Sequence, residues 1–409
     1  MKRPSLDKNL LALVLLSFVA RYWESMKSSL FVGDEVIFIP GALHFVTEGR
    51  FNYRGVHPPL HNLLTYIQML LLGDNPYGWR LLNITLGSLS VGLLVAIGKK
   101  LFPDRRIAYL AGAFLTIEPM HIIMSRTNFI DISPIFFLLC GVYGMLVYRE
   151  DNRRSLLWTG MSLGAAVAEK WYVLPPACLV AAYAFLSAQR PDTPRWKETL
   201  YRASSLSIVP ATIYLLAFAP WFKMGHTLSE FFRLQVDMYR LLQASRIEDF
   251  MVLFRQIMPS SSPLKWFITP LIGQAPMFRE GSLAQFRVFM NNPPVWLLTI
   301  PACIWCAFAY ARKRDPAVLF VLLLFLASYA QFAVVDRPIF LHSATIVLPA
   351  AFLMISYALV DVLNRTTTSA LPYRLFLLLT ISWGIYLYPL IIGKLVPVAL
   401  YSPLFQLSR

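Results

Sequence analysis

Two adjacent carboxylates, Asp34 and Glu35, follow Gly33 about ten residues beyond the first hydrophobic segment of the chain. Removing neighbouring carboxylates from water at the edge of an apolar segment is costly, so the pair requires a physical reason. One interpretation is a general base beside a partner group, at a site on the non-cytoplasmic side of a membrane. The other is an ordinary solvated helix N-terminus, where the helix dipole favours acidic residues.

Other ionisable side chains occupy the short polar turns between apolar segments. In the topology set out below, these turns fall on the same side of the membrane as Asp34. Ionisable groups at or inside a membrane edge are functional candidates, and their shared side favours one outward-facing cavity over unrelated ion pairs. For Arg80 alone, an alternative is that its side chain extends to the interface. The residues are His57, Arg80, Glu118, His121, Arg126, Asp131, Glu169, Lys170, Asp336, Arg337 and His342.

The composition excludes most soluble classes of protein. Of the 409 residues, 57% are hydrophobic and only 14% are charged, which is typical of a polytopic membrane protein. The formal net charge is +15, but the basic residues cluster between apolar segments instead of forming a nucleic-acid surface. The sequence contains neither of the glycine-rich nucleotide-binding motifs G-x-x-x-x-G-K-[ST] and G-x-G-x-x-G. The four cysteines fall inside apolar segments, so we expect neither a disulfide framework nor a zinc site.

Apolar segments of about 17 or more residues indicate about eleven membrane spans. A cytoplasmic N-terminus places most short basic clusters inside the cell, as the positive-inside rule requires. We therefore expect an all-α polytopic membrane protein with its N-terminus in the cytoplasm and its C-terminus outside. The predicted spans lie near 9–27, 77–98, 106–118, 130–148, 155–169, 172–188, 204–222, 294–311, 316–335, 339–363 and 372–396.

Two outer loops, residues 28–76 and 223–293, are expected to contain helices that lie in the membrane interface. In the first loop, apolar residues recur at helical spacing over 35–48 and 60–72, and both runs are short for a span. In the second, residues 231–242 show the same spacing, with Phe231, Leu234 and Met238 on one face. Within a single membrane domain, residues 1–409, we interpret 223–293 as a cap over the cavity; an ordinary surface excursion is the alternative.

Taken in order, these residues resemble the protein O-mannosyltransferases, which are multi-spanning glycosyltransferases of the GT-C type that use lipid-phosphate sugars. Two positions depart from the family pattern, since Gly55 replaces a usual acidic residue and Asn62 a usual Lys. Residues 223–293 are also too short for the soluble insert of eukaryotic members. In this respect the chain resembles an archaeal or bacterial member. The matching motifs are Gly33-Asp34-Glu35, His57-Pro58-Pro59-Leu60, Pro76-Tyr77-x-x-Arg80, Ser125-Arg126 with Asp131, Lys170-Trp171, Gln235-x-x-Met238-Tyr239, Asn292-Pro293-x-x-Trp296 and Arg337-x-x-Phe340-x-His342.

The resemblance implies inverting transfer of a sugar, by family default mannose, from a polyprenyl or dolichyl phosphate to a Ser or Thr hydroxyl of a protein. Such a displacement requires one general base, and its phosphate leaving group requires cations more than a proton. By resemblance, Asp34 is the base, and Glu35 orients the acceptor or a neighbouring cation. The expected contacts to lipid phosphate or sugar are His57, Arg80, Arg126, Lys170, Arg337 and His342, with Glu118 and Asp131 interpreted as counter-ions of Arg126.

The expected partners are the polyprenyl- or dolichyl-phosphate sugar, a secreted or membrane protein acceptor and the lipid bilayer, without nucleic acid. The expected location is the plasma membrane, with the active site on the non-cytoplasmic face. No ligand spacing requires a metal, although a divalent cation is compatible with the residues. Two alternatives stay open. One is a transferase acting on a lipid or glycan, like the bacterial aminoarabinose transferases of lipid A. The other is a transporter or flippase, although no internal repeat supports it.

Overall fold

The structure is a computed structural model, and the residues described are 7–50, 56–150, 152–186, 194–244, 262–268, 272–334, 339–365 and 370–406. Within these ranges the regular structure is mostly helical, with one three-stranded antiparallel sheet. The chain divides into two compact units. Unit 1 comprises residues 1–25, 94–126 and 246–409, and unit 2 comprises residues 26–93 and 127–245.

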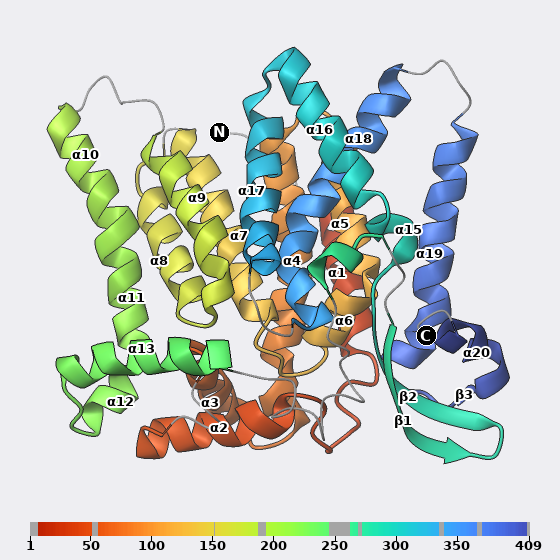
Figure 1. Ribbon diagram of the computed structural model, residues 1–409, viewed down its shortest axis with the longest axis horizontal. Coiled ribbons are helices and arrows are strands. Elements are labelled where there is room, and N and C mark those ends of the chain that lie inside the picture. Colours follow the sequence, from red (N-terminus) through yellow and green to blue (C-terminus); the bar gives the residue numbers. More distant parts are fainter. Residues whose placement is uncertain are drawn as a thin grey trace. The chain divides into compact units, whose positions relative to one another are not determined.

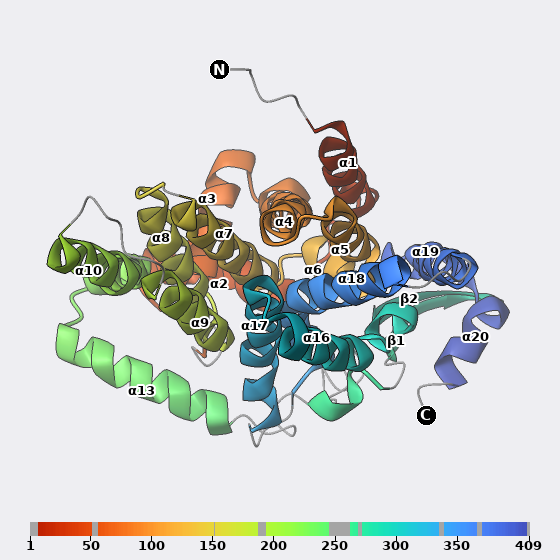
Figure 2. The same cartoon turned by 90° about the horizontal axis from the view of Figure 1, so that it is seen from above.

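Unit 2 contains a set of roughly parallel helices and two helices that run across them. Helices α7, α8 and α9 lie side by side, whereas α2 and α13 run nearly at right angles to them (Figures 1 and 2). The elements of unit 2 are α2 (Glu35–Glu48), α3 (Leu60–Leu72), α4 (Pro76–Leu101, whose last residues belong to unit 1), α7 (Ile132–Arg149), α8 (Ser155–Val167), η2 (Trp171–Val173), α9 (Leu174–Phe185), α10 (Arg195–Ala203), η3 (Ser204–Ile208), α11 (Val209–Ala217), α12 (Ala219–Lys223) and α13 (Leu228–Ala244).

Close packing of the parallel helices depends on small residues in α8. A Cβ atom added at Gly160 would lie 1.9 Å from the carbonyl oxygen of Ser205, so the backbones can approach this closely only because residue 160 is glycine. Glycine at such contacts is typical of helices that pack in a membrane, because van der Waals contact replaces the hydrophobic drive. The result is a tightly packed frame around the polar residues of unit 2.

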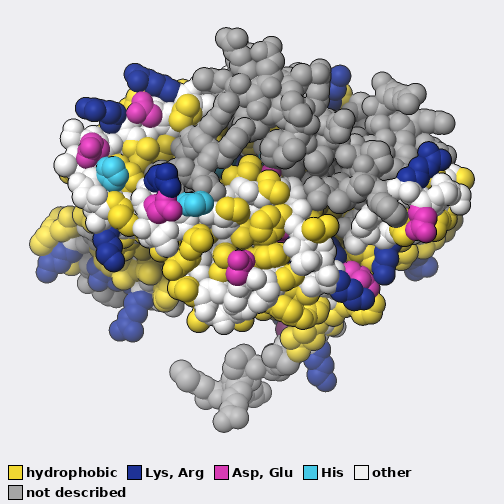
Figure 3. Space-filling model, turned by 90° about the horizontal axis from the view of Figure 1, so that it is seen from below, with side chains coloured by type: hydrophobic (Ala, Val, Ile, Leu, Met, Phe, Trp, Pro, Cys, Tyr) yellow, Lys and Arg dark blue, Asp and Glu magenta, His cyan; other side chains and the backbone are white. Residues whose placement is uncertain are grey.

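Helices α2 and α13 each bury one face and expose the other. Phe45 of α2 packs in one core cluster with Phe231 and Met238 of α13, as the helical spacing of the latter two residues predicted. On the opposite face of α13, Phe232 and Val236 are exposed. Figure 3 shows one face of the molecule, on which hydrophobic side chains lie among charged ones. An exposed apolar face on a short helix is compatible with the expected position in a membrane interface.

Unit 1 contains the second group of long helices and the sheet. Helices α16 and α17 both contact α18, and α18 also contacts α5 (Figure 2). Helices α5 and α6 meet at a bend of 62° beside Pro119. The elements of unit 1 are α1 (Lys8–Tyr22), α5 (Arg105–Ile117), α6 (Pro119–Ser125), η4 (Pro263–Lys265), β1 (Ile272–Glu280), β2 (Leu283–Met290), α15 (Pro293–Trp296), α16 (Thr299–Lys313), α17 (Pro316–Ala333), η5 (Leu341–Val347), α18 (Leu348–Arg365), α19 (Leu371–Ile391), β3 (Val396–Pro397) and α20 (Val398–Gln406).

Seven helices among the described residues are long and apolar enough to cross a membrane, or eight if the bent pair α5–α6 is one span. Each of the other predicted spans, near 9–27, 155–169 and 172–188, also contains a helix, but a shorter one. The prediction of a mostly helical protein with many apolar helices is therefore confirmed. The count of eleven and the orientation stay predictions.

The expectation of helices alone is wrong for one segment. Strands β1 and β2 form a hairpin within residues 223–293, which were expected to contain interfacial helices, and β3 pairs with β2. Glu280 pairs with Leu283, so the loop consists of Gly281 and Ser282, and Gly281 has φ +57. A two-residue loop with glycine first is a recognised hairpin signal, which the search for helical periodicity overlooked. Residues 245–261 of the expected cap lie outside the described residues.

Candidate active site

The turn before α2 is shaped by Gly33, which has φ +59. A Cβ atom at this position would lie 2.6 Å from Cζ of Phe129, so both the backbone conformation and the available space require glycine. The carbonyl oxygen of Asp34 then accepts hydrogen bonds from the amides of Ile37 (2.9 Å) and Phe38 (3.0 Å), which start the helix. The turn therefore places Asp34 and Glu35 at the N-terminus of α2.

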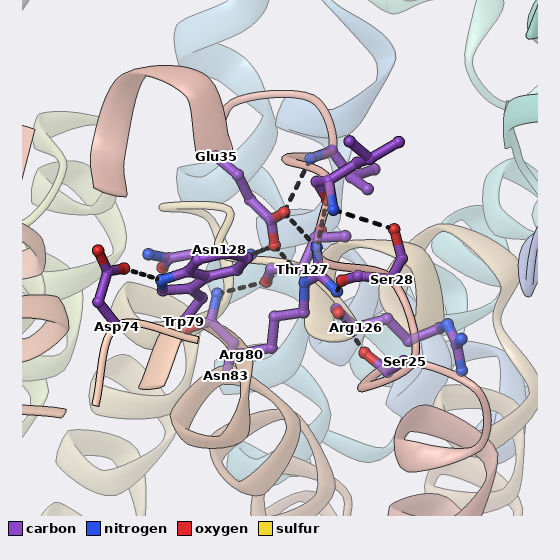
Figure 4. Close-up of polar contacts among 12 residues, drawn as sticks. Ser25, Ser28, Glu35, Asp74, Trp79, Arg80, Asn83, Arg126, Thr127 and Asn128 are labelled. Carbon is purple, nitrogen blue, oxygen red and sulfur yellow. Dashed lines mark hydrogen bonds and ion pairs between the residues drawn. The ribbon is translucent and has the colours of Figure 1, made fainter. Parts of the chain in front are cut away.

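Glu35 is completely buried and fully hydrogen-bonded. Its Oε1 accepts from Nε of Arg80 (2.7 Å) and from the backbone amide of Asn128 (3.0 Å). Its Oε2 accepts from Nη2 of Arg80 (2.7 Å) and from the amide of Val32 (2.8 Å). Figure 4 shows this arrangement around Glu35 and Arg80. Four hydrogen bonds satisfy the carboxylate, so it joins three segments of unit 2 and its position is fixed.

Arg80 and its neighbour Asn83 hold the backbone around this ion pair. The guanidinium of Arg80 also donates to the carbonyl oxygens of Ser28 and Leu30, both at 2.8 Å. One turn further along α4, the amide nitrogen of Asn83 donates to the carbonyls of Thr127 and Phe129, both at 2.8 Å. Arg80 is buried and not extended to an interface, so that alternative from the sequence is wrong.

Asp34 differs sharply from its neighbour. Its side chain is half-buried, and its carboxylate accepts no hydrogen bond from any residue that the structure describes. Asp34 lies in the connection between α1 and α4, outside the candidate spans. Burial, followed by the negative charge of Asp131, raises the pKa of Asp34 from 3.8 to about 7, and the positive charge of Lys170 partly opposes this. A carboxylate with this pKa and no internal partner can accept a proton near neutral pH.

The two charges that act on Asp34 form their own ion pair. Nζ of Lys170 lies 2.7 Å from Oδ1 of Asp131, which precedes α7. Tyr172 contacts both, because its ring lies 4.9 Å from Nζ of Lys170 and its hydroxyl donates to the carbonyl of Asp131 (3.3 Å). The sequence interpretation made Asp131 a counter-ion of Arg126, and the structure provides Lys170 as its partner.

In unit 1, Arg126 and Glu118 lie in the region of the α5–α6 bend. Nη1 of Arg126 donates to the carbonyls of Arg21 (2.9 Å) and Trp23 (2.5 Å), at the C-terminus of α1. Glu118 is buried and accepts from the indole of Trp296 (3.0 Å), and it makes no ion pair with Arg126 among the described residues. The interpretation of Glu118 as a counter-ion of Arg126 is therefore wrong in this structure.

The three other residues predicted to contact the donor lie in different parts of the chain. His57 is half-buried and lies just before α3 in unit 2. His342 is half-buried in η5 of unit 1, with its ring stacked on Phe340 at 5.6 Å. Arg337 lies outside the described residues.

A third group of buried polar residues in unit 2 consists of His61, Ser133 and Glu169, of which sequence reasoning selected only Glu169, as one of the ionisable residues in the outer turns. Glu169 had a visible signal, because it directly precedes Lys170 in a short turn. His61 had none, because it lies in an apolar helical run where a histidine is ordinarily a packed residue.

Comparison with known proteins identifies the family. A family model described as dolichyl-phosphate-mannose-protein mannosyltransferase matches residues 11–225, more than half of the chain. The chain belongs to this mannosyltransferase family. It is 21% identical over 419 residues to a polyprenol-phosphate-mannose–protein mannosyltransferase of Corynebacterium glutamicum, covering 85% of this chain and 80% of that protein.

Solved structures show the same fold for this family member. The Pmt1-Pmt2 protein O-mannosyltransferase complex of Saccharomyces cerevisiae, bound to the sugar donor, matches with a TM-score of 0.76 at 14% identity, covering 98% of this chain and 92% of that chain. ArnT of Cupriavidus metallidurans bound to undecaprenyl phosphate matches with a TM-score of 0.55 at 15% identity, covering 98% and 76%. The chain is thus a multi-pass membrane glycosyltransferase of the GT-C type.

Within this mannosyltransferase, the adjacent carboxylates have different chemical capacities. Glu35 is held by hydrogen bonds to Arg80 and to two backbone amides, so its position is fixed. Asp34 has its carboxylate oxygens open and a pKa of about 7. Among the described residues, no group of three or more His, Cys, Asp or Glu side chains is placed to hold a metal ion. Among the described residues of unit 2, Asp34 is therefore a candidate proton acceptor, beside a fixed carboxylate and an ion pair.

Proposed function

We propose that this mannosyltransferase transfers mannose from a polyprenyl or dolichyl phosphate to a Ser or Thr hydroxyl of a protein, with inversion, on the non-cytoplasmic face of the plasma membrane. The family membership supports the donor class, and the names of the relatives support mannose and a protein acceptor. The single observation that carries the mechanism is the contrast between Asp34, whose carboxylate accepts no hydrogen bond from the described residues, and Glu35, which is fully bonded.

In the proposed reaction, the Asp34 carboxylate removes the proton of the acceptor hydroxyl as that oxygen attacks C1 of the sugar. The bond between C1 and the phosphate oxygen breaks, and its electron pair remains on the phosphate, which leaves with the lipid. Inversion follows because attack and departure occur on opposite faces of C1. A phosphate monoester is already a stable anion, so its departure requires cations and no general acid.

The remaining residues receive supporting roles. Glu35 and Arg80 are proposed to fix the turn that presents Asp34. For Arg80, we propose this role in place of the contact with the sugar donor that the sequence suggested. Lys170 is proposed to attract the donor phosphate while it is paired with Asp131. His57 in unit 2, and Arg126, Arg337 and His342 in unit 1, are proposed as donor contacts on the family resemblance alone.

The test is sugar transfer by the purified protein in lipid nanodiscs, with radiolabelled polyprenyl-phosphate mannose and a Ser/Thr-rich peptide. We expect the wild type to label the peptide and Asp34→Asn to lose at least about a thousandfold in kcat, because the base is gone while the shape is kept. Glu48→Gln is the matched control, since it neutralises an exposed carboxylate on the same helix, and it should leave the rate unchanged.

Each other outcome removes a defined part of the proposal. Transfer that survives Asp34→Asn eliminates Asp34 as the base. Label that enters a lipid or glycan fraction in place of the peptide replaces the protein acceptor with the alternative acceptor class. If the wild type binds the donor but transfers nothing to any of these acceptors, the transfer function itself is contradicted.

A further inference from the structure

A compact group of buried polar side chains lies beside the candidate base in unit 2. We call His61, Ser133 and Glu169 the anchor cluster. The Ser133 hydroxyl donates to Oε2 of Glu169, and Nδ1 of His61 lies 3.4 Å from Oγ of Ser133 and 3.7 Å from Oε2 of Glu169. None of the three side chains is more than 3% exposed. The cluster therefore joins the first turns of α3 and α7 to the connection between α8 and η2.

Two members of the anchor cluster adjoin the residues that surround Asp34. Ser133 lies two positions after Asp131 in the chain, and Glu169 lies directly before Lys170. Lys170 is extended, with φ −153 and ψ 124, and follows the turn that carries Glu169. Glu169 is thus held by Ser133, while the next residue, Lys170, reaches Asp131.

The third member reaches the helix that carries the base. The ring of His61 meets the ring of Phe38 edge-on, with centroids 5.0 Å apart. Phe38 is in the first turn of α2, and its amide donates to the carbonyl of Asp34 at 3.0 Å. In addition, the amide of Leu60 donates to the carbonyl of Ala168 at 3.1 Å, which ties α3 to the same connection. All three segments that carry Asp34, Asp131 and Lys170 therefore contact one cluster.

The anchor cluster contains buried polar atoms without hydrogen bonds, and an apolar cluster of the same size would avoid their desolvation cost. Nε2 of His61 and Oε1 of Glu169 are buried and have no hydrogen-bond partner among the residues described. A buried ionisable pair with unsatisfied atoms is ordinarily no more stable than apolar residues of similar volume. Such a pair is explained more directly by a requirement for fixed geometry than by stability.

We propose that His61, Ser133 and Glu169 are positioning residues that hold Lys170 and Asp131 at fixed places beside Asp34. This inference rests on the proposed function, because it assigns Asp34 as the base. The titratable and charged groups of the segments around Asp34 are then Asp131 before α7, the Glu169–Lys170 connection, His61 from α3 and the Glu35–Arg80 pair between α2 and α4. The cluster acts through these neighbours and does not itself touch substrate.

The test uses Ser133→Ala, which removes one hydroxyl and leaves every charge in place. Glu169 then loses its bond to α7, so Lys170 moves more than Asp131, which stays with α7. Because Lys170 lowers the pKa of Asp34, we expect the acidic limb of the kcat/KM profile to move to higher pH. We also expect kcat to fall about tenfold with the donor KM within about twofold, as for a displaced catalytic group. Ser133→Thr keeps the hydroxyl and should restore both values.

Tyr148→Phe is a matched control on the same helix. Its hydroxyl donates to buried Glu198 at 2.5 Å near the other end of α7, so the substitution also removes one hydroxyl bond to a buried carboxylate. We expect a comparable loss of thermal stability from Tyr148→Phe and Ser133→Ala, but an unchanged pH profile only for Tyr148→Phe.

The pKa of Asp34 should also be measured without turnover, by infrared titration of its carboxyl band after subtraction of the Asp34→Asn spectrum. A higher pKa in Ser133→Ala than in the wild type supports the positioning role even if no acceptor is transferred. An unchanged Asp34 band and an unchanged pH profile, together with reduced stability, would overturn it and leave the cluster purely structural. Absence of transfer by the wild type contradicts the proposed function and not this inference.

Discussion

Glu35 and Arg80 form a two-point ion pair between α2 and α4, with both hydrogen bonds at 2.7 Å and at most 2% of either side chain exposed. In a buried pair the Coulomb attraction roughly offsets the cost of desolvation, so its net contribution to stability is small. Removing one partner is different, because the remaining charge stays buried and unpaired. The pair therefore acts as a fixed joint between two segments that are 45 positions apart in the chain.

Breaking this joint should destabilise the protein strongly. We expect Glu35→Gln to lower the free energy of unfolding by about 3 kcal/mol, because Arg80 is left buried with a neutral partner. The measurement is reversible unfolding in mixed detergent micelles. Glu48→Gln, on the exposed end of α2, should change stability by less than about 0.5 kcal/mol. Equal losses of stability from Glu35→Gln and Glu48→Gln would contradict a stabilising role for the Glu35–Arg80 ion pair.

Gly33→Ala should also be destabilising, for two separable reasons. The alanine must adopt φ +59, and its Cβ would lie 2.6 Å from the Phe129 ring. Gly225→Ala isolates the first reason, since Gly225 has φ +93 and, apart from its two chain neighbours, no heavy atom of the described residues lies within 4 Å of the position that a Cβ atom would take there. We expect about 1 kcal/mol for Gly225→Ala and about 2–4 kcal/mol for Gly33→Ala, measured by the same unfolding assay.

A second substitution tests the cause of the difference. Phe129→Leu in the Gly33→Ala background should recover part of the lost stability, because the smaller side chain relieves the contact. If Gly33→Ala costs no more than Gly225→Ala, the ring does not constrain the turn.

The sequence offered candidate residues for this site but not their contacts. Asp34, Glu35 and Lys170 were recognised because ionisable groups at a membrane edge are unusual, and such an argument needs no tertiary structure. It could not assign partners, because partners come from distant segments. Glu35 was matched to no particular cation, and Asp131 was assigned to Arg126, whereas its partner in the structure is Lys170.

His61 and Ser133 of the anchor cluster, and the hairpin, were missed for different physical reasons. His61 lies within an apolar helical pattern, and only the fold shows that it faces Glu169, which is 108 positions away by residue number and 3.7 Å away in space. The hairpin had a local signal in Gly281-Ser282. It was overlooked because a long loop between apolar segments was interpreted by helical spacing alone. Periodicity located Phe231 and Met238 correctly, because one face of α13 is buried.

Activity should depend on pH through Asp34. Because its pKa is raised to about 7, we expect kcat/KM to fall about tenfold per pH unit below pH 7 and to be level above it. A slope governed by an ordinary carboxylate would instead begin near pH 4. A profile that is flat between pH 5 and 8 would contradict Asp34 as the base.

Stability should show the opposite dependence on pH. A carboxyl whose pKa is raised in the folded state contributes stability that is fully present below its unfolded pKa of 3.8 and is lost as the pH rises through about 7. We therefore expect the wild type to lose stability relative to Asp34→Asn between pH 5.5 and 8.5. Unfolding of both proteins at the two pH values gives the measurement. If the difference between them does not change with pH, Asp34 does not titrate in this range.

The ion pair beside Asp34 provides two substitutions with opposite expected effects. Asp131 raises the pKa of Asp34 and Lys170 lowers it. Asp131→Asn should therefore move the acidic limb of kcat/KM to lower pH, and Lys170→Met should move it to higher pH, each by about one pH unit. Both single variants lose stability because each leaves a buried charge without its partner, whereas the double variant removes both charges and should return the limb close to its wild-type position. Shifts of both single variants in the same direction would show that the titrating group is not Asp34.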